Sequence, residues 1–147
     1  MTMNGNPSQL YPVPAVRALI TDAQGRILLL QRSAAGHEPG AWCLPGGKID
    51  YGQTVEAALA GEILEETSLQ LLAAEFFFFQ DSLSPGPEGM HCLNFYFHCQ
   101  VSGELRLNAE SSDYAWIGPE EIGDYDIVFK NDEAIRRHFE SRGSNKS

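Results

Sequence analysis

The stretch of sequence that decides the fold joins two adjacent glycines to a glutamate-rich segment. It begins Gly46-Gly47-Lys48-Ile49-Asp50-Tyr51-Gly52-Gln53 and continues, past an intervening segment, to Glu62-Ile63-Leu64-Glu65-Glu66. Residues 54–67 are predicted to form a helix, because Thr54 is a suitable N-cap, Glu56 suits the first turn, and proline is absent. The sequence therefore predicts a glycine-rich loop that leads into a helix bearing three glutamates.

The three glutamates share one side of this predicted helix. At about 100° per residue, Glu62, Glu65 and Glu66 lie within an arc of about 100°. Like charges at such spacings destabilise a helix by about 0.2–0.5 kcal/mol per pair, and nothing basic lies within one turn on that face. A hard cation such as Mg²⁺ would relieve the repulsion, and a Gly-Gly loop can bring backbone oxygens close to it. The alternative is a solvated helix face, which is the usual meaning of a charge run.

Composition limits the classes of function. The 147 residues fit one domain, and the formal net charge of −10 argues against a protein that binds a nucleic-acid polymer or an anionic membrane surface. The longest apolar run, residues 69–79, is interrupted by polar residues and is too short to span a bilayer. The start of the chain lacks a signal-peptide pattern, and three cysteines without a Cys-x-x-Cys pair indicate a reducing compartment. We therefore expect a cytoplasmic protein suited to bind a divalent cation.

The chain as a whole, residues 1–147, is predicted to be one mixed domain in which helices cover a sheet. Strands are predicted at residues 13–20, 27–32, 42–44, 71–80, 90–101, 104–107 and 114–117, the first two paired as a hairpin. The four phenylalanines at 76–79 indicate that both faces of their strand are covered. A helix start is expected at Pro119 and a terminal helix over residues 131–141. Residues 1–12 are interpreted as a loose lead-in, and residues 142–147 are expected to fray.

The segment from residue 47 to residue 69 resembles the signature of the Nudix hydrolases. That signature is Gly, five residues, Glu, seven residues, Arg-Glu, an aliphatic, any residue, Glu-Glu, any residue, Gly and an aliphatic. The positions that match it are Gly47, Glu62, Ile63, Glu65, Glu66 and Leu69. Residues 42–46, 114–116 and 120–121 also resemble the family, so the likeness extends over about residues 13–140.

Three positions depart from the signature. Gln53 replaces the first Glu, Gly61 replaces the Arg, and Ser68 replaces the last Gly. In the family, that Glu and Arg are thought to form an ion pair that braces the loop against the helix. Losing both leaves no orphan charge, and Gln53 can still hydrogen-bond a backbone group. Ser68 implies mild strain or a different exit from the helix. Losses of supporting contacts commonly cost about 10–100-fold in metal affinity or activity.

The resemblance implies a Nudix-type α/β/α sandwich, with a mixed β-sheet between helices. It also implies hydrolysis of a phosphoanhydride bond, with Mg²⁺ or Mn²⁺, in a nucleoside diphosphate linked to another group. Carried over by position, Glu62 and Glu66 would hold metal, Glu65 would ligate or support a second ion, and the Gly47 carbonyl would complete the primary site. Such chemistry needs charge neutralisation and an oriented water more than covalent help.

The sequence offers further candidate site residues. Glu110 is a candidate extra metal ligand or general base, with an acidic surface loop as the alternative, and the sequence leaves the base open between Glu62 and Glu110. Arg17, Arg32 and Lys48 are candidates for phosphate contact, because positive groups are otherwise scarce. Aromatic residues that could lie beside a nucleobase, but that are usually core, are Tyr11, Trp42, Phe95, Phe97 and Phe129.

Several alternatives remain beside the interpretation as a hydrolase. A zinc site is discounted, because on one strand His91 and Cys99 would be separated by about 26 Å. A catalytically weakened nucleotide-binding or regulatory module would keep the fold, and an acidic protein-interaction domain would keep neither metal nor chemistry. The leaving group stays open among sugar nucleotides, ADP-ribose, dinucleoside polyphosphates and oxidised nucleoside triphosphates. A homodimer is also left open.

Overall fold

The computed structural model describes residues 11–36, 38–83 and 90–144. The predictions for residues 1–10 and 145–147 therefore lie outside the described residues. The elements, in chain order, are β1 (Val13–Ile20), β2 (Ile27–Arg32), β3 (Trp42–Cys43), β4 (Gly46–Lys48), α2 (Val55–Thr67), β5 (Gln70–Leu83), β6 (His91–Ser102), β7 (Ser111–Ile117), the 3₁₀ helix η1 (Pro119–Asp124) and α3 (Asn131–Ser144).

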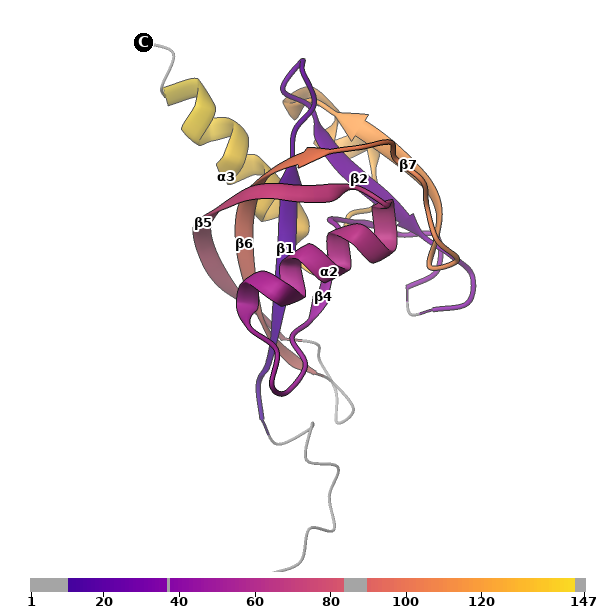
Figure 1. Ribbon diagram of the computed structural model, residues 1–147. Coiled ribbons are helices and arrows are strands. Elements are labelled where there is room, and N and C mark those ends of the chain that lie inside the picture. Colours follow the sequence, from indigo (N-terminus) through magenta and orange to yellow (C-terminus); the bar gives the residue numbers. More distant parts are fainter. Residues whose placement is uncertain (1–10, 37, 84–89, 145–147) are drawn as a thin grey trace, which may run out of the picture.

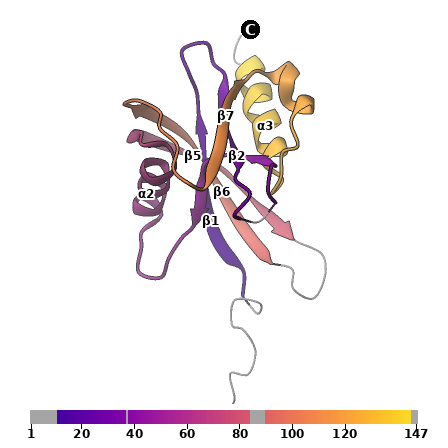
Figure 2. The same ribbon diagram turned by 90° about the vertical axis from the view of Figure 1, so that its right-hand side faces the viewer.

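The strands form two sheets that lie between two helices. The larger sheet has the order β4-β1-β6-β5 and the smaller one the order β3-β2-β7. The larger sheet is mixed, because β1 runs parallel to β6 but antiparallel to β4. Helix α2 lies on one side of the strands and α3 on the other (Figure 1 and Figure 2). This is the predicted α/β/α arrangement, with the strands divided between two sheets.

Alternate side chains of β1 and β2 enter different cores. Val16, Ala18 and Leu28 are fully buried with α2, whereas Leu19 and Leu29 are fully buried with α3. Helix α2 contributes Ala58, Leu59 and Ile63 to the first core, and α3 contributes Ala134 and Ile135 to the second. Since both faces of these strands are covered, their sequences are almost continuously apolar.

Helix α2 begins and ends close to the predicted residues. The Thr54 side chain accepts a 3.1 Å hydrogen bond from the Ala57 N–H, as an N-cap does. At the other end Ser68 has a left-handed backbone, φ 65°, and its N–H donates to the Leu64 carbonyl. Ser68 thus keeps the helix exit for which glycine is preferred, at a cost of about 1 kcal/mol.

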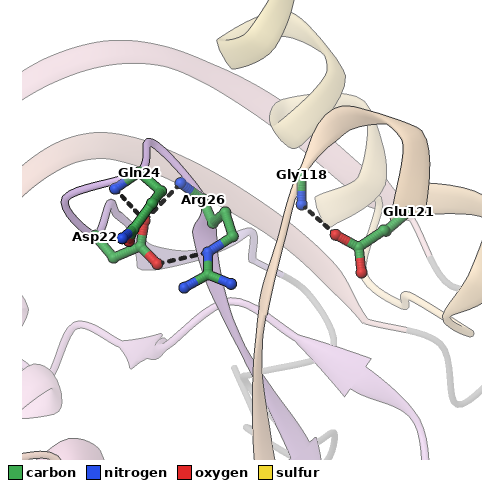
Figure 3. A network of polar contacts seen from close by, with 5 residues as sticks. All are labelled: Asp22, Gln24, Arg26, Gly118 and Glu121. Carbon is green, nitrogen blue, oxygen red and sulfur yellow. Dashed lines mark hydrogen bonds and ion pairs between the residues drawn. The ribbon is translucent and has the colours of Figure 1, made fainter.

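The predicted hairpin of β1 and β2 is wrong. The two strands belong to different sheets, and beside the turn Thr21 and Ile27 form an isolated antiparallel bridge while the Asp22 N–H donates to the Arg26 carbonyl. Between them the Asp22 carboxylate accepts hydrogen bonds from the N–H groups of Gln24 and Arg26 and from the Arg26 side chain (Figure 3). Local contacts close this turn, so the strands that leave it are free to take other partners.

The prediction that both faces of β5 are covered is also wrong. Phe77 and Phe78 pack against the core on the α3 side, but Phe76 and Phe79 are exposed. Strand β5 lies at the edge of the larger sheet, where the helices cover only part of it: Leu71 packs on the α2 core, and Arg137 of α3 lies over the Phe78 ring. A run of apolar residues predicts a strand, but it does not predict whether a helix will cover both faces of that strand.

Three smaller differences concern element boundaries. Residues 104–107 form no strand; Leu105 and Leu107 instead pack on the α2 core as irregular chain. Residues 46–48, expected to be loop, form β4, because β1 offers them an antiparallel partner. Helix α3 continues to Ser144, into the segment that the sequence predicts to fray. None of the described helices is long and apolar enough to cross a bilayer.

Candidate active site

Strand β4 brings the two glycines under helix α2. Gly46 and Gly47 pair with Arg17 and Val16 of β1. A Cβ on Gly47 would lie 2.7 Å from the carboxylate carbon of Glu62, and a Cβ on Gly46 would lie 2.0 Å from the Val16 carbonyl oxygen. Neither position can hold a side chain without displacing its neighbour. The absent side chain at 47 therefore leaves room for the Glu62 carboxylate beside the backbone of β4.

Glu66 is tied to the same strand. Its Oε1 accepts a 2.8 Å hydrogen bond from the Gly46 N–H. Burial, together with the neighbouring Glu62 and Glu110 carboxylates, raises the pKa of Glu66 to about 8, although the Gly46 N–H and the Arg17 guanidinium act in the opposite direction. This carboxyl group therefore lies where negative charge is poorly compensated.

Glu62 is surrounded by further carboxylates. Burial raises its pKa, and the charges of Glu65, Glu110 and Asp50 raise it further, while Arg17 partly opposes them. Glu65 is exposed on α2, and Glu110 is exposed in the turn before β7, where its carbonyl accepts a 3.0 Å hydrogen bond from Ser33. The fold thus gathers the four predicted glutamates into one zone of negative potential.

The chemistry of this zone fits a hard divalent cation. Carboxylate and carbonyl oxygens are the ligands that Mg²⁺ and Mn²⁺ take, and the residues that could supply them here are Gly47, Glu62, Glu65 and Glu66. Over residues 11–36, 38–83 and 90–144, no three acidic, histidine or cysteine side chains already converge closely enough to form a metal-binding cluster. The candidate ligand residues therefore lie on adjacent elements, β4 and α2, but their side chains do not converge on one point.

Two arginines lie over one aromatic ring near this zone. The guanidinium carbons of Arg17 and Arg32 lie 5.1 and 5.0 Å from the centre of the Phe129 ring. Arg17 Nη1 donates to the Leu44 carbonyl at 3.5 Å, and its buried Nε has no hydrogen-bond partner among the described residues. Phe129 itself has a left-handed backbone, φ 62°. Lys48 lies exposed on β4.

The NUDIX domain family model matches residues 11–139. The chain belongs to the Nudix family. It is 31% identical to the nucleoside triphosphatase NudI of Escherichia coli, over 80% of this chain and 90% of that protein. The MutT NUDIX hydrolase of Burkholderia pseudomallei is 32% identical, with a TM-score of 0.66 over 73% of this chain and 83% of that one.

A third similarity concerns the fold alone. The NUDIX domain of NrtR from Shewanella oneidensis, solved in complex with ADP ribose, has a TM-score of 0.73 at 21% identity, covering 96% of this chain and 99% of that chain. The family, the fold class and the assignment as a Nudix hydrolase, all expected from the sequence, are thereby confirmed. Members of this family act on nucleoside diphosphate derivatives and generally use divalent cations. The roles of individual residues stay predictions.

The departures from the Nudix signature have visible local consequences. The Gln53 side chain accepts a 3.0 Å hydrogen bond from the Asp50 N–H, and the Gln53 N–H donates to the Asp50 carbonyl. These two bonds close the loop between Asp50 and Gln53. The expected hydrogen bond of Gln53 to a backbone group is therefore present. A Cβ at Gly61 would meet nothing within 4 Å, so space for a side chain remains there.

One residue that supports the site of this Nudix hydrolase is missed by the sequence analysis. Asn131, the first residue of α3, is fully buried; its Oδ1 accepts from the Leu44 N–H at 2.9 Å, and its Nδ2 donates to the Tyr96 hydroxyl and to the Phe129 carbonyl. It ties the start of α3 to the chain just before β4. Asparagine at the start of a predicted helix is the signal that could have indicated it, since this side chain commonly bonds nearby backbone.

Proposed function

We propose that this Nudix hydrolase cleaves a phosphoanhydride bond in a small nucleoside diphosphate derivative, with Mg²⁺ or Mn²⁺ held by Glu62, Glu65, Glu66 and the Gly47 carbonyl. The observation that carries the proposal is the approach of the Glu62 carboxylate to Gly47, next to a Glu66 whose pKa is raised to about 8. Crowded carboxylates destabilise the metal-free protein, and a bound cation would remove that cost.

The cation, when bound, neutralises charge on the phosphate oxygens and lowers the pKa of a water molecule. The carboxylates of the chain hold it and orient the diphosphate. Either Glu62 or Glu110 accepts the proton from the attacking water, and Glu65 supports a second ion. Glu110 is the only one of the four glutamates that comes from outside α2. Replacing it therefore tests the base without altering the helix.

The two arginines on Phe129 are proposed to contact the phosphates, together with Lys48. Arginine suits this role because its fork of N–H groups matches phosphate oxygens. The buried Arg17 Nε has no hydrogen-bond partner among the described residues, so this guanidinium keeps an unused donor. Both guanidinium carbons lie about 5 Å from the centre of the Phe129 ring, which positions the two groups as a pair.

A nucleoside triphosphate is the first substrate class to test. The relative NudI is named a nucleoside triphosphatase, and it is 31% identical over 90% of its length. A triphosphate is also a nucleoside diphosphate joined to a further group, as the family chemistry requires. The proposed compartment is the cytoplasm, which the three free thiols of Cys43, Cys92 and Cys99 support.

The deciding experiment is turnover of a nucleotide panel by the full chain with Mg²⁺ or Mn²⁺. The panel should contain nucleoside triphosphates, ADP-ribose, a sugar nucleotide and a dinucleoside polyphosphate. Release of nucleoside monophosphate or of phosphate that stops with a chelator supports the proposal. Nucleotide binding without turnover would instead favour a regulatory module, the alternative that Gln53, Gly61 and Ser68 motivate.

A further inference from the structure

Strand β5 is the outer strand of the larger sheet and carries an unusual concentration of exposed apolar side chains. In the described part of the chain its only strand neighbour is β6, so the opposite edge is open (Figure 1). Four large apolar residues are more than half exposed along it: Leu72 (63%), Phe76 (53%), Phe79 (58%) and Leu83 (67%). An open edge of this kind is a template for pairing with another chain.

The two central phenylalanines lie on the same face of the sheet. Phe76 pairs with Phe97 and Phe79 with Phe95, and the register shifts between Phe76 and Phe78. Because Phe95 and Phe97 are two residues apart on β6, they share a face. The rings agree, since the centre of Phe76 lies 5.5 Å from that of Phe97 and the centre of Phe79 lies 6.2 Å from that of Phe95. The shift therefore brings both exposed rings together.

The four exposed large apolar residues of β5 are symmetric about the midpoint between Phe77 and Phe78. Around that point Phe76 is matched by Phe79, and Leu72 by Leu83. An antiparallel copy of β5, related by a two-fold axis there, would place each of these residues against its match. The two carboxylates would meet neutral partners, with Glu75 opposite Gln80 and Asp81 opposite Ala74.

We propose that β5 is the dimer interface of this protein and that its occupant is a second copy of the same strand. Such an isologous contact needs one self-complementary surface, which the symmetric pattern supplies. It also pairs the open backbone edge and covers the Phe76–Phe79 patch, here defined as Phe76, Phe79 and the Phe95 ring between them. Each protomer carries a net charge of −10, so added salt should tighten the dimer by screening the repulsion.

The test uses analytical ultracentrifugation of the full chain over a range of concentrations. The expected result is a dimer, weakened about 30-fold or more by Phe76→Lys or by Phe79→Glu, because a charge at the centre of an apolar contact behaves as a lost hot spot. The decisive variant is Phe76→Lys with Phe79→Glu, in which each lysine would face the partner's glutamate. This double variant should recover dimerisation, and salt should weaken its dimer.

Matched controls separate this contact from general effects. Phe76→Glu with Phe79→Glu should stay monomeric, since it places like charges opposite each other. Tyr51→Ser, on the exposed loop before α2, should leave the dimer unchanged. Melting curves identify any variant that fails to fold. A monomeric parent chain, or a Phe76→Lys/Phe79→Glu variant no better than either single variant, overturns the proposal and leaves the patch to a different partner.

Discussion

The carboxylate of Glu62 lies so close to Gly47 that a single methyl group on that glycine would overlap it, at 2.7 Å from the carboxylate carbon. The Glu62 carboxylate would therefore have to move to admit a side chain at position 47. This contact and the hydrogen bond from Gly46 to Glu66 join β4 to α2 at two successive residues. Both are accessible to simple substitutions.

Gly47→Ala is expected to weaken cation binding. The new Cβ displaces the Glu62 carboxylate from its place beside β4, and misplaced ligands commonly cost about 10–100-fold in affinity. Calorimetric titration with Mn²⁺ measures the effect. Gly61→Ala is the matched control, because its Cβ meets nothing within 4 Å and should add about 1 kcal/mol to the free energy of unfolding. Unchanged Mn²⁺ affinity in Gly47→Ala would remove Glu62 from the proposed site.

Glu66→Gln should separate stability from activity. In the metal-free protein, burial raises the pKa of Glu66 to about 8, so ionisation of this group destabilises the fold increasingly as pH rises from about 4.5 to about 8. Gln keeps an acceptor for the Gly46 N–H but cannot ionise. Urea unfolding with a chelator should therefore show the variant more stable than the parent at about pH 9 and similar at about pH 4. Metal-dependent turnover should be lost, and full activity would refute the assignment of Glu66.

Restoring the signature brace should raise activity. Gly61 has open space for a longer side chain, and Gln53 already lies in the loop before α2. Gln53→Glu combined with Gly61→Arg is expected to increase kcat/KM with the best substrate of the panel, up to about 10-fold if loop support limits the rate. Gly61→Arg alone is the control, since it replaces the helix glycine but supplies no glutamate at position 53 to form the ion pair. An equal rate in parent and double variant would show that the brace is dispensable.

Phe129→Leu should weaken substrate binding through the arginines. Arg17 and Arg32 both lie about 5 Å from this ring, and loss of cation–π contact is expected to raise KM about 3-fold or more. Phe139→Leu in α3 is the matched control, because it alters a comparable ring of the α3-side core that holds no arginine of the site. Steady-state kinetics with both variants decide the point. Equal KM values in Phe129→Leu and the parent would exclude the ring from substrate positioning.

A pair of histidines should make the fold acid-sensitive. His98 Nε2 and His138 Nδ1 lie 3.0 Å apart. The pKa of His138 is lowered to about 4, mainly by burial and further by the nearby His98 and Arg142. The unfolded chain takes up this proton first, so stability should fall as pH drops from about 6.5 to about 4. His138→Gln should flatten urea unfolding across that window. The control is His91→Gln on β6, whose side chain pairs with Asp81.

The sequence predicts those elements best whose signal is local. The predicted bounds of β1, β2 and α2 are correct to within a residue or so, because near-continuous apolar residues and an N-cap act on adjacent chain. The pairing of β1 with β6 cannot be found this way, since it depends on residues far along the chain. Strand β4 is built from Gly46 and Gly47, which have little preference for strands, and it forms because β1 pairs with it.

The candidate site divides in the same way. Helical spacing is enough to group Glu62, Glu65 and Glu66, because these residues lie on one helix. Phe129, whose ring lies about 5 Å from two guanidinium groups, and Asn131, which bonds to Leu44 and Tyr96, come from near the C-terminal end of the chain. No spacing rule connects segments so distant, and only tertiary packing brings them together.

Strand β1 serves both helices with alternate residues, and this limits how the protein can change. Deleting one residue near its start would exchange the side chains that face α2 for those that face α3, and would turn Arg17 away from Phe129. The loops on either side of β1 can therefore change in length, whereas the number of residues in β1 is fixed because its two faces pack against α2 and α3. Among related chains, insertions and deletions should accumulate around β1 and spare its interior.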